Sequence, residues 1–384
     1  MLFKHLYLAF LASAVAAQDM MNLTATIMST DSLSQLQEYL SMFPDLLSAL
    51  GDMSNITVLA PSNDAFEAFL NTSVGGSLAE RPGSIEALLQ YHVLNGSYPA
   101  SSITNTSSFI PTMLTNESYT NVTRGQTVEA VVIGNETVFY GGLLSNVTVS
   151  QANVNFTGGV VHIVDDVLTI PRNITDTALA ANLTSLAGAL TETNLLDSVN
   201  GLRDVTVFAP NNDAFQSIGT AIGNFTTDDL SNILSYHVVN GSSVGYSSHL
   251  ENGTMLQTLE GGNLTITMNN GSIFVNSAEV VMPNVLVANG VVHVIDNVLN
   301  PNATMGPSTS ATSGAPAFTS ASTATEAPFT SDVPNASETI EGGPGAASSE
   351  AAAASTSTGV AVPMKTGAVG AAALFGAGAA FLNY

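Results

Sequence analysis

The sequence contains no cysteine and no tryptophan, and only six of its 384 residues are lysine or arginine. A chain without cysteine forms no disulfides and offers no thiolate to a metal ion or to redox chemistry. Its stability must therefore come from hydrophobic cores that are large enough to need no covalent cross-link.

Basic residues are scarcest in the central part of the chain. Between residues 18 and 355 the basic residues are four arginines, while all 30 acidic residues lie in the same span, so its net charge is 4 − 30 = −26. Proteins that bind nucleic acids or anionic lipids use clustered lysine and arginine to neutralise phosphates. The composition therefore excludes nucleic acid as a partner. The four arginines are Arg81, Arg124, Arg172 and Arg203.

The N-terminus has the pattern of an export signal. Lys4 and His5 give a short polar start, and residues 6–16 form an apolar stretch that is too short to cross a bilayer. Small residues at positions 15–17 suit a signal peptidase. We expect residues 1–17 to be a signal peptide that is cleaved after Ala17.

The C-terminus carries the three parts of a glycosylphosphatidylinositol (GPI) attachment signal. Small residues at 355–358 are followed by a polar spacer that contains Lys365, and a weakly apolar tail then ends the chain. We expect the anchor at Ser355 (or Ser357), with the spacer and tail, residues 359–384, removed. The alternatives are a tail-anchored helix or a disordered end rich in alanine and glycine.

Asn-x-Ser/Thr sequons are unusually dense. Of 33 asparagines, 19 begin such a sequon, and in an exported chain they predict surface loops that carry N-linked glycans. Asn182 falls inside a predicted helix and is expected to be less accessible. The other candidates are Asn22, Asn55, Asn71, Asn95, Asn105, Asn116, Asn121, Asn135, Asn146, Asn155, Asn173, Asn224, Asn240, Asn252, Asn263, Asn270, Asn302 and Asn335.

Three sequence blocks occur twice in the same order, which is the sign of a repeated module. The offset between the copies falls from 205 − 56 = 149 to 236 − 91 = 145 and then to 290 − 159 = 131, so the first copy carries extra residues mainly between its second and third blocks. We place the two modules at residues 20–171 and 172–301. The blocks are ITVLAPSNDAF (56–66) with VTVFAPNNDAF (205–215), YHVLNGS (91–97) with YHVVNGS (236–242), and GVVHIVDDVL (159–168) with GVVHVIDNVL (290–299).

Each copy is expected to begin with a helix. In the first copy Thr30 or Asp31 caps it, and apolar residues recur at helical spacing as far as Leu50. In the second copy the helix follows Thr175 or Asp176 and carries a similar leucine stripe. A strand comes next in both copies.

Further helices and hairpins are expected after that strand. Proline stops the strand, and Ser62 or Asn211 offers a side-chain oxygen to cap the next helix. Another helix ends at His92 or His237, and the remaining segments are short and β-branched, with Asn-Gly and Gly-Gly turns. Helices mixed with hairpins predict an α+β fold.

After the second module the composition changes. Residues 302–358 are dominated by serine, threonine, alanine, proline and glycine, with few large apolar side chains. Such a segment buries too little surface to fold. We therefore expect a disordered stalk that holds the two modules away from the membrane.

The three ordered blocks resemble the motifs of the fasciclin (FAS1) domain family over residues 20–301. The resemblance implies two tandem domains, each a wedge of two β-sheets with helices packed along one side. It also implies roles in cell adhesion or in matrix or cell-wall organisation, with a lipid anchor in the outer leaflet. The stalk lacks the dense Ala-Pro repeats of plant relatives, which favours a fungal source.

One departure from the family concerns integrins. Some animal members bind integrins through an Asp-Ile pair just before the Gly-Val-Val-His block, and here these positions read Asn153-Val154 and Asn284-Val285. The carboxylate that would coordinate a receptor-bound metal ion is missing in both copies. The sequence therefore argues against integrin binding.

The Tyr-His boxes are the binding candidates that the resemblance supplies: Tyr91, His92, Tyr236 and His237. The competing interpretation is that both histidines end an apolar helix face and belong to the core. Each copy repeats only two histidines, the others being His162 and His293. A zinc site needs three or four ligands, so we predict no metal and no cofactor.

Catalytic patterns are weak. Gly241–Gly245 matches Gly-x-Ser-x-Gly, but it follows the Tyr-His helix and lacks the strand, elbow and helix that expose a nucleophile. Asp64 and Asp213 fall in the first turn of a helix, where a carboxylate is favoured by the dipole. Asp165, Asp166 and Asp296 fall where a strand ends. We predict no enzymatic activity.

The sequence thus predicts a non-catalytic cell-surface glycoprotein for cell adhesion or wall organisation. Its partners would be surface, matrix or wall glycoconjugates or proteins, and its location the outer face of the plasma membrane or the cell wall. The alternatives are a lumenal protein of the vacuole or secretory pathway, and an enzyme that acts on wall glycans. The enzyme would need a pair of facing carboxylates, and no acidic pair repeats in that way.

Overall fold

The computed structural model describes residues 20–72, 75–76, 78, 83–303, 313–331, 333–334, 336 and 340. The predicted signal peptide, the GPI attachment residues and tail, and the sequon at Asn335 lie outside the described residues and remain predictions.

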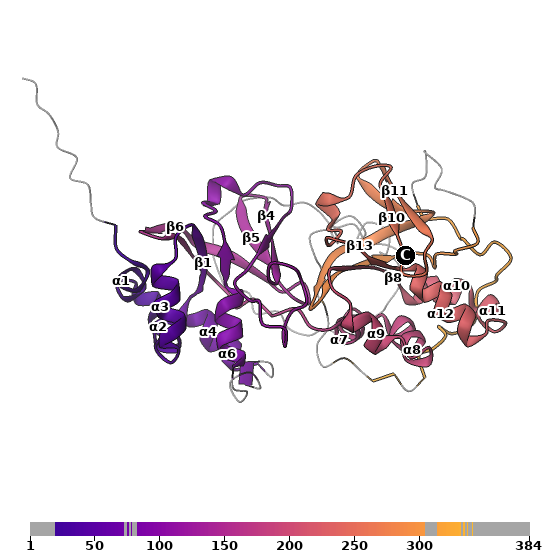
Figure 1. The fold of residues 1–384 in the computed structure, drawn as a ribbon, viewed down its shortest axis with the longest axis horizontal. Coiled ribbons are helices and arrows are strands. Elements are labelled where there is room, and N and C mark those ends of the chain that lie inside the picture. Colours follow the sequence, from indigo (N-terminus) through magenta and orange to yellow (C-terminus); the bar gives the residue numbers. More distant parts are fainter. Residues whose placement is uncertain are drawn as a thin grey trace, which may run out of the picture. The chain divides into compact units, whose positions relative to one another are not determined.

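The described elements of the first domain run from helices to strands (Figure 1). They are α1 (Leu23–Met28), the 3₁₀ helix η1 (Asp31–Leu33), α2 (Ser34–Ser41), α3 (Pro44–Asp52), β1 (Ile56–Pro61), α4 (Asn63–Leu70), α6 (Ser84–Tyr91), β2 (Val93–Asn95), η2 (Ala100–Ser102), β3 (Ser108–Pro111), β4 (Thr127–Ile133), β5 (Glu136–Tyr140), β6 (Asn146–Phe156) and β7 (Gly159–Val164).

The second domain repeats this order. Its elements are α7 (Ile174–Ala180), α8 (Thr184–Glu192), α9 (Leu196–Gly201), β8 (Val205–Pro210), α10 (Asn212–Ser217), α11 (Gly219–Ile222), α12 (Thr227–Tyr236), β9 (Val238–Asn240), η3 (Ser247–His249), β10 (Met255–Gln257), β11 (Asn263–Asn269), β12 (Ser272–Val275), β13 (Ala278–Val287) and β14 (Gly290–Ile295).

The strands of each domain hydrogen-bond in one continuous order: β2-β1-β7-β6-β5-β4-β3 in the first and β9-β8-β14-β13-β12-β11-β10 in the second. Only β1 with β7, and β8 with β14, pair in parallel among these ladders. Isolated bridges, Leu94 with Thr112 and Val239 with Thr258, bring the two edges of each sheet together. Each sheet therefore curls into a nearly closed wedge, and the expected α+β fold is confirmed.

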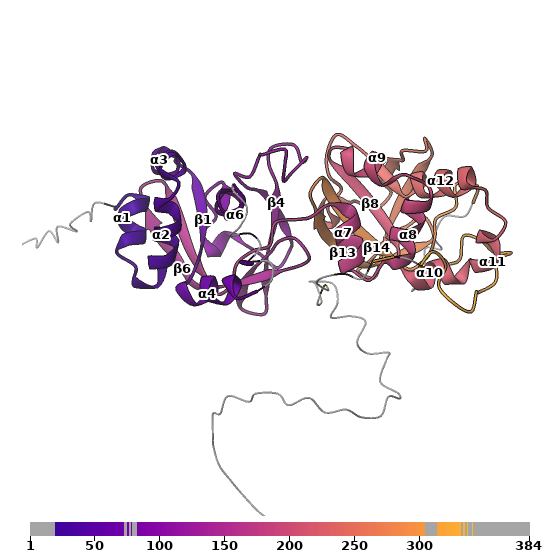
Figure 2. The same ribbon diagram turned by 90° about the horizontal axis from the view of Figure 1, so that it is seen from below.

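Each domain has two large hydrophobic clusters. The first lies between the helices and the sheet, and Figures 1 and 2 show the helices along one side of each sheet. The second lies inside the curled sheet, where all seven strands of the first domain contribute buried side chains. Since one cluster touches every strand, the sheet must curve around it. These side chains are Leu59, Leu94, Ile110, Val128, Phe139, Val147 and Val164.

The single opening helix expected in each domain is wrong in both. In the first domain Pro44 starts a new helix, because a proline disfavours helical backbone in the residue before it. In the second domain the chain leaves the helix after Ala180, and Asn182 takes a left-handed φ of 55° in an exposed turn. The Asn182 sequon is therefore more accessible than expected.

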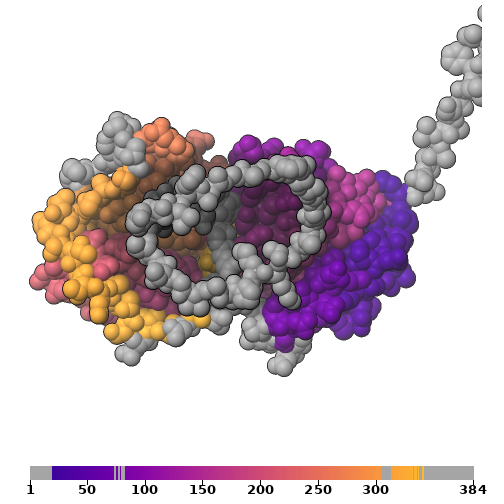
Figure 3. Space-filling model, turned by 180° about the vertical axis from the view of Figure 1, so that it is seen from behind, coloured from indigo at the N-terminus to yellow at the C-terminus, as the bar shows by residue number. Residues whose placement is uncertain are grey.

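Residues 313–331, which we call the strap, differ from the disordered stalk expected there. The strap lies across the helices of the second domain (Figure 3). Phe318 packs on Phe225 and Phe329 packs edge-on against Phe215, with ring centroids 5.8 and 6.1 Å apart. Composition averaged over the whole segment hides these two phenylalanines, which bury enough apolar surface to order the chain around them.

The strap places an aromatic ring against Phe215, and in the first domain the equivalent ring comes from a helix of the domain itself. There, Tyr39 of α2 lies against Phe66 with centroids 5.3 Å apart. Aligned at an offset of 184 − 34 = 150, helix α8 has alanine at the Tyr39 position. Phe329 fills the vacated space beside Phe215, and it approaches so closely that a Cβ on Gly188 would meet its carbonyl oxygen.

Candidate functional site

The first Tyr-His box ends a helix and begins a strand. His92 caps α6, and its side chain is buried. Its Nδ1 donates to the carbonyl oxygen of Leu88 at 2.8 Å, and its Nε2 accepts from the backbone N–H of Leu168 at 3.0 Å. The ring thus ties the end of the helix to the segment after β7, and the Leu168 donor fixes the tautomer with the proton on Nδ1.

The second Tyr-His box repeats this clip. His237 donates from Nδ1 to the carbonyl oxygen of Ile233 at 2.7 Å and accepts at Nε2 from the backbone N–H of Leu299 at 2.8 Å. Both contacts correspond to those of the first domain, since Leu168 and Leu299 close the third block in each copy. The clip is therefore part of the fold itself.

The histidines of the third block form a second pair of clips. His162 of β7 donates from Nε2 to the carbonyl oxygen of Tyr98 at 2.9 Å, and its Nδ1 accepts from the backbone N–H of Asn153 at 3.3 Å. His293 of β14 makes the same two kinds of bond at 2.8 and 3.3 Å. Both rings are fully buried.

Burial keeps these imidazoles neutral. It lowers the pKa of His92, His237 and His293 to about 4, and it also lowers the pKa of His162. Because both ring nitrogens of each histidine already have partners, neither is free to bind a metal or to move a proton. The interpretation as core histidines is confirmed. Among the described residues, no group of three or more His, Asp or Glu side chains is arranged to hold a metal ion.

The tyrosines of the boxes are also buried. The hydroxyl of Tyr91 donates to the carbonyl oxygen of Thr127 at 3.0 Å, and that of Tyr236 donates to the carbonyl oxygen of Asn263 at 2.9 Å. Burial raises the pKa of Tyr91 well above its usual value. Tyr91, His92, Tyr236 and His237 are at most 5% exposed. The structure gives each of them a partner inside the fold, and their contact with another molecule remains a prediction.

Asn153 and Asn284 lie at equivalent β-bulges in β6 and β13. Each takes a left-handed backbone, with φ of 60° and 64°, where the register of the strand shifts. Asparagine tolerates this conformation better than most residues. Each side-chain oxygen accepts a backbone N–H at 2.9 Å, from Ala100 and Ser247. In place of an integrin-type carboxylate, this position holds an amide that stabilises the bulge.

The serine pentad has no catalytic geometry. Gly241–Gly245 follows strand β9 and precedes the short helix η3, and the central Ser243 lies in an exposed loop. A nucleophile elbow places its serine between a strand and a full helix. Asp64 and Asp213 lie in the first turns of α4 and α10, as expected.

The carboxylates that end the third block hold neighbouring strands together. Asp165 accepts the backbone N–H of Thr148 at 2.6 Å, and Asp296 accepts the backbone N–H of Glu279 at 2.8 Å. These pairs are equivalent in the two domains, since 279 − 148 and 296 − 165 both equal 131. Their conserved spacing is thus explained by strand pairing.

In contrast to the buried histidines and tyrosines, most sequon asparagines face solvent. Of the 19 sequons, 19 − 1 = 18 begin at a described asparagine, and 17 of those asparagines are exposed. Asn121 is the exception among them, because it is half-buried. Its surroundings belong to a contact between the two domains.

The inserted residues of the first copy make this contact. The loop between β3 and β4 spans residues 112–126, whereas the equivalent loop between β10 and β11 spans only residues 258–262. The long loop faces residues 201–204 and the turn after β13. We call the contact of residues 109–127 with residues 201–204, 244–246 and 286–288 the joint. The insertion expected between the second and third blocks is confirmed.

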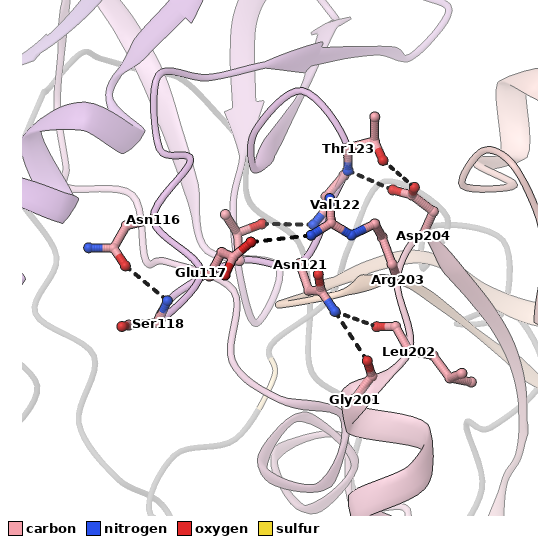
Figure 4. Close-up of polar contacts among 11 residues, drawn as sticks. Asn116, Glu117, Ser118, Asn121, Val122, Thr123, Gly201, Leu202, Arg203 and Asp204 are labelled. Atoms are coloured by element: carbon pink, nitrogen blue, oxygen red, sulfur yellow. Dashed lines mark hydrogen bonds and ion pairs between the residues drawn. The ribbon is translucent and has the colours of Figure 1, made fainter.

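Backbone and side-chain bonds cross the joint (Figure 4). Asn121 donates from Nδ2 to the carbonyl oxygens of Gly201 at 3.2 Å and Leu202 at 3.0 Å. Asp204, which is 6% exposed, accepts the backbone N–H of Thr123 at 2.7 Å and also its hydroxyl. The neighbouring ion pair of Arg203 with Glu117, at 3.5 Å, is largely solvent-exposed and contributes little.

An apolar patch lies beside these polar bonds. Tyr246 and Val122 are buried there, and the ring of Phe109 packs against them. From the turn between β5 and β6, Leu144 reaches into the hydrophobic cluster of the second domain despite a left-handed φ of 54°. Such a backbone is costly for leucine, and it persists where burial outweighs the strain.

Sequence reasoning did not identify the joint. The one signal for it was the longer first copy, because an insertion between repeated blocks must form an additional surface loop. Nothing in the sequence shows that Asn121 faces Gly201 instead of solvent.

Comparisons with known proteins agree with the fold. The fasciclin domain family matches residues 31–171 and 181–301. The chain is similar to a fasciclin-like arabinogalactan protein of Arthroderma benhamiae, with 37% identity over 80% of this chain and 73% of the relative. It is also similar to the fasciclin-like arabinogalactan protein elcF of Phaeosphaeria nodorum, with 32% identity over 72% of this chain and 87% of the relative.

Among solved structures, the chain resembles a FAS1 domain pair from the insect cell adhesion molecule Fasciclin I. The identity is 21%, the match covers 70% of this chain and 97% of the other, and the TM-score is 0.35. The family match covers most of the chain and both copies of the repeat. This chain therefore belongs to the fasciclin family and carries two tandem fasciclin domains.

Proposed function

We propose that the protein is a non-catalytic, GPI-anchored glycoprotein of the cell surface or wall that acts in adhesion or wall organisation. Its tandem domains would present binding surfaces to glycoconjugates or proteins outside the cell. Two weak sites on one chain gain effective concentration when both engage.

One observation carries the proposal: the repeated histidines, which could serve in catalysis, are bonded inside the domains, whereas the outer surface is dense in sequons. The four repeated histidines are buried with both nitrogens bonded. Seventeen described sequon asparagines are exposed. Such a molecule is built to display a surface, and its similarity to fasciclin-like arabinogalactan proteins supports that role.

The anchor is tested by enzymatic release. Phosphatidylinositol-specific phospholipase C should release the protein from intact cells into the medium. A chain in which Ser355 and Ser357 are both replaced by bulky residues should be secreted without treatment. Retention of the natural chain on phospholipase-treated cells would contradict the proposed anchor. Among the described residues, no helix has the length and apolar character of a membrane span.

Location and role need a second experiment. An epitope tag inserted within residues 304–312 avoids both ends, which are expected to be removed. We expect surface staining of unpermeabilised cells and weaker attachment to a substrate when the gene is deleted. Staining confined to a vacuole would favour the lumenal alternative, and unchanged attachment would contradict the adhesive role.

A further inference from the structure

Asn121 stands apart from the other described sequons. Every other described sequon asparagine is exposed, whereas Asn121 is half-buried within the joint. Its main chain is held as well: the backbone N–H of Asn121 donates to the carbonyl oxygen of Ala288 at 2.7 Å, and its carbonyl oxygen accepts the N–H of Asp204 at 3.4 Å. This sequon is therefore bonded to the second domain through both backbone and side chain.

The side-chain amide of Asn121 already uses its hydrogens in bonds to the second domain. The Nδ2 of Asn121 points at the carbonyl oxygens of Gly201 and Leu202, 3.2 and 3.0 Å away (Figure 4). A linked sugar would replace one of the two amide hydrogens and would place its ring against this backbone. At least one of the two bonds would then be lost, and the two chain segments would have to separate.

The hydroxyl of the sequon is occupied too. Thr123 donates its hydroxyl and its backbone N–H to the buried carboxylate of Asp204. Hydrogen bonds to a charged acceptor are among the stronger ones. An enzyme that reads the sequon uses both the amide and the hydroxyl, and in the joint both groups already donate to atoms of the second domain.

We infer that glycosylation of Asn121 and closure of the joint exclude one another, so that this sequon is a modification site available only when the two domains are apart. In the transfer, Nδ2 of Asn121 forms a bond to the anomeric carbon of a lipid-pyrophosphate-linked oligosaccharide. The bond from that carbon to the pyrophosphate oxygen breaks, the lipid pyrophosphate leaves, and the amide loses one proton to solvent.

The order of synthesis makes both outcomes accessible. Asn121 precedes Gly201 by 80 residues, so it enters the secretory lumen before the segment that covers it. A chain modified at that stage keeps its two domains apart, and a chain that escapes modification closes the joint over the sequon. Occupancy at this one asparagine would then decide how freely the two domains move.

The first test compares glycan occupancy with joint closure in the secreted full-length protein. Peptide mass spectrometry after enzymatic deglycosylation in heavy-oxygen water reports occupancy at each sequon. Hydrogen exchange reports closure, because the N–H groups of Asn121 and Thr123 are protected only in the joint. Molecules with a free Asn121 should show slow exchange at the N–H groups of Asn121 and Thr123, and molecules with a glycan at Asn121 should show fast exchange at these two groups.

Every combination decides the question. A free Asn121 with protection, or an occupied Asn121 without it, supports the inference. An occupied Asn121 in a closed joint overturns it, and so does a free Asn121 in an open joint. N116Q is the matched control, because Asn116 begins an exposed sequon on the same loop and its side-chain oxygen accepts the backbone N–H of Ser118 within that loop. Its loss should leave exchange at the N–H groups of Asn121 and Thr123 unchanged.

The first test, like the biological meaning of the inference, rests on the proposed export of the protein. The second test does not depend on export. Since the chain has no cysteine, N121C and N116C each provide a single thiol in the full-length protein. N121C loses the side-chain bonds of Asn121 but keeps its backbone bond to Ala288 and the bonds of Thr123 to Asp204. A thiol-reactive sugar should therefore label N121C at least about fivefold more slowly than N116C, the factor by which one retained hydrogen bond shifts such an equilibrium. D204N, which weakens the joint, should speed the labelling of N121C.

The two tests separate the proposals. If the secreted protein carried no glycan at any sequon, the proposed surface glycoprotein would be wrong, while slow labelling of N121C would still support the inference. Equal labelling rates for N121C and N116C, with exchange at the N–H groups of residues 121 and 123 still slow, would overturn the inference and leave the proposed function standing.

Discussion

Tyr246 of the second domain stacks on Phe109 of the first, with ring centroids 4.1 Å apart and ring planes 5° from parallel. The hydroxyl of Tyr246 also bonds to the hydroxyl of Thr127 at 3.0 Å, in a buried setting. Burial raises the pKa of Tyr246 to about 12, so the phenol stays protonated and remains a donor. The stacked pair and the polar bonds of Asn121 thus support the same joint.

The joint can be weakened at this pair. Y246F removes one buried hydrogen bond and should lower the free energy of unfolding by about 1 kcal/mol. Y246A also removes the stacked ring and should cost about 3 to 5 kcal/mol. Calorimetry should then resolve two transitions that lie closer together in the natural chain. In a double-mutant cycle, T127V and Y246F should couple, and additive effects would show that the bond contributes nothing.

The histidine clips are expected to be essential to each domain. H92A leaves the N–H of Leu168 buried without its acceptor and removes a packed ring, so it should cost about 3 kcal/mol or more. H237A should do the same in the second domain, where the partner is Leu299. Urea denaturation of both variants measures these losses. Losses below 1 kcal/mol in both domains would contradict a structural role for the clips.

Acid should unfold the protein through its buried histidines. The folded-state pKa of His92, His237 and His293 is about 4, below the ordinary 6.5, so the unfolded state binds more protons between these values. Stability is therefore present above pH 6.5 and is lost as the pH falls toward 4, by up to about 3 kcal/mol per histidine. Urea titrations between pH 7 and pH 4 measure the slope, and H237Q should make it shallower.

Glu129 should act with the opposite sign. It is fully buried beneath the joint, one carboxylate oxygen accepts from Ser107, and the other has no partner. Burial raises its pKa to about 7. The folded state then binds more protons between about pH 4.5 and 7, so this contribution to stability is lost as the pH rises through that window.

The variant E129Q isolates this effect. A neutral amide avoids burying a charge, so E129Q should be the more stable protein above pH 7, by up to about 3 kcal/mol. Below pH 4.5 the two proteins should differ little. A stability difference that does not change between pH 5 and pH 8 would show that Glu129 does not titrate in this window.

The strap can be displaced by a single methyl group. A Cβ on Gly188 would lie 1.8 Å from the carbonyl oxygen of Phe329, so G188A should push the strap off α8. Limited proteolysis within residues 313–331 should then become faster. G51A is the matched control, since a Cβ on Gly51 of α3 meets nothing within 4 Å and should stabilise its helix by up to about 1 kcal/mol. Unchanged cleavage in G188A would show that the strap does not depend on this contact.

Much of the fold was predictable because its signals are local. The strand-proline-helix block, the caps at Ser62 and Asn211, and the helix that ends in the Tyr-His box all follow from residues within a few positions of each other. The repeat added certainty, because each element could be seen twice. The helix break at Pro44 could be predicted because proline disfavours helical backbone in the residue before it. The leucines at helical spacing on both sides of Pro44 instead suggested one continuous helix.

The site residues were less predictable because their roles depend on distant partners. A buried histidine and an exposed one look alike in the sequence, and the bond from Leu168 to His92 spans 76 residues. The same holds for Phe329, which packs on a helix more than a hundred residues earlier in the chain.

The sequence by itself determined the absence of disulfides, the two-module plan, the acidic charge and the density of sequons, since these depend only on which residues are present and in what order. Only the tertiary structure decided which of those residues face solvent. Asn121 begins an Asn-x-Ser/Thr sequon as its neighbours do, but packing of a second domain turns its amide toward Gly201 and Leu202. Burial is a property of the whole fold, and that is why, among the described sequons, the one at Asn121 alone lies half-buried in a contact between domains.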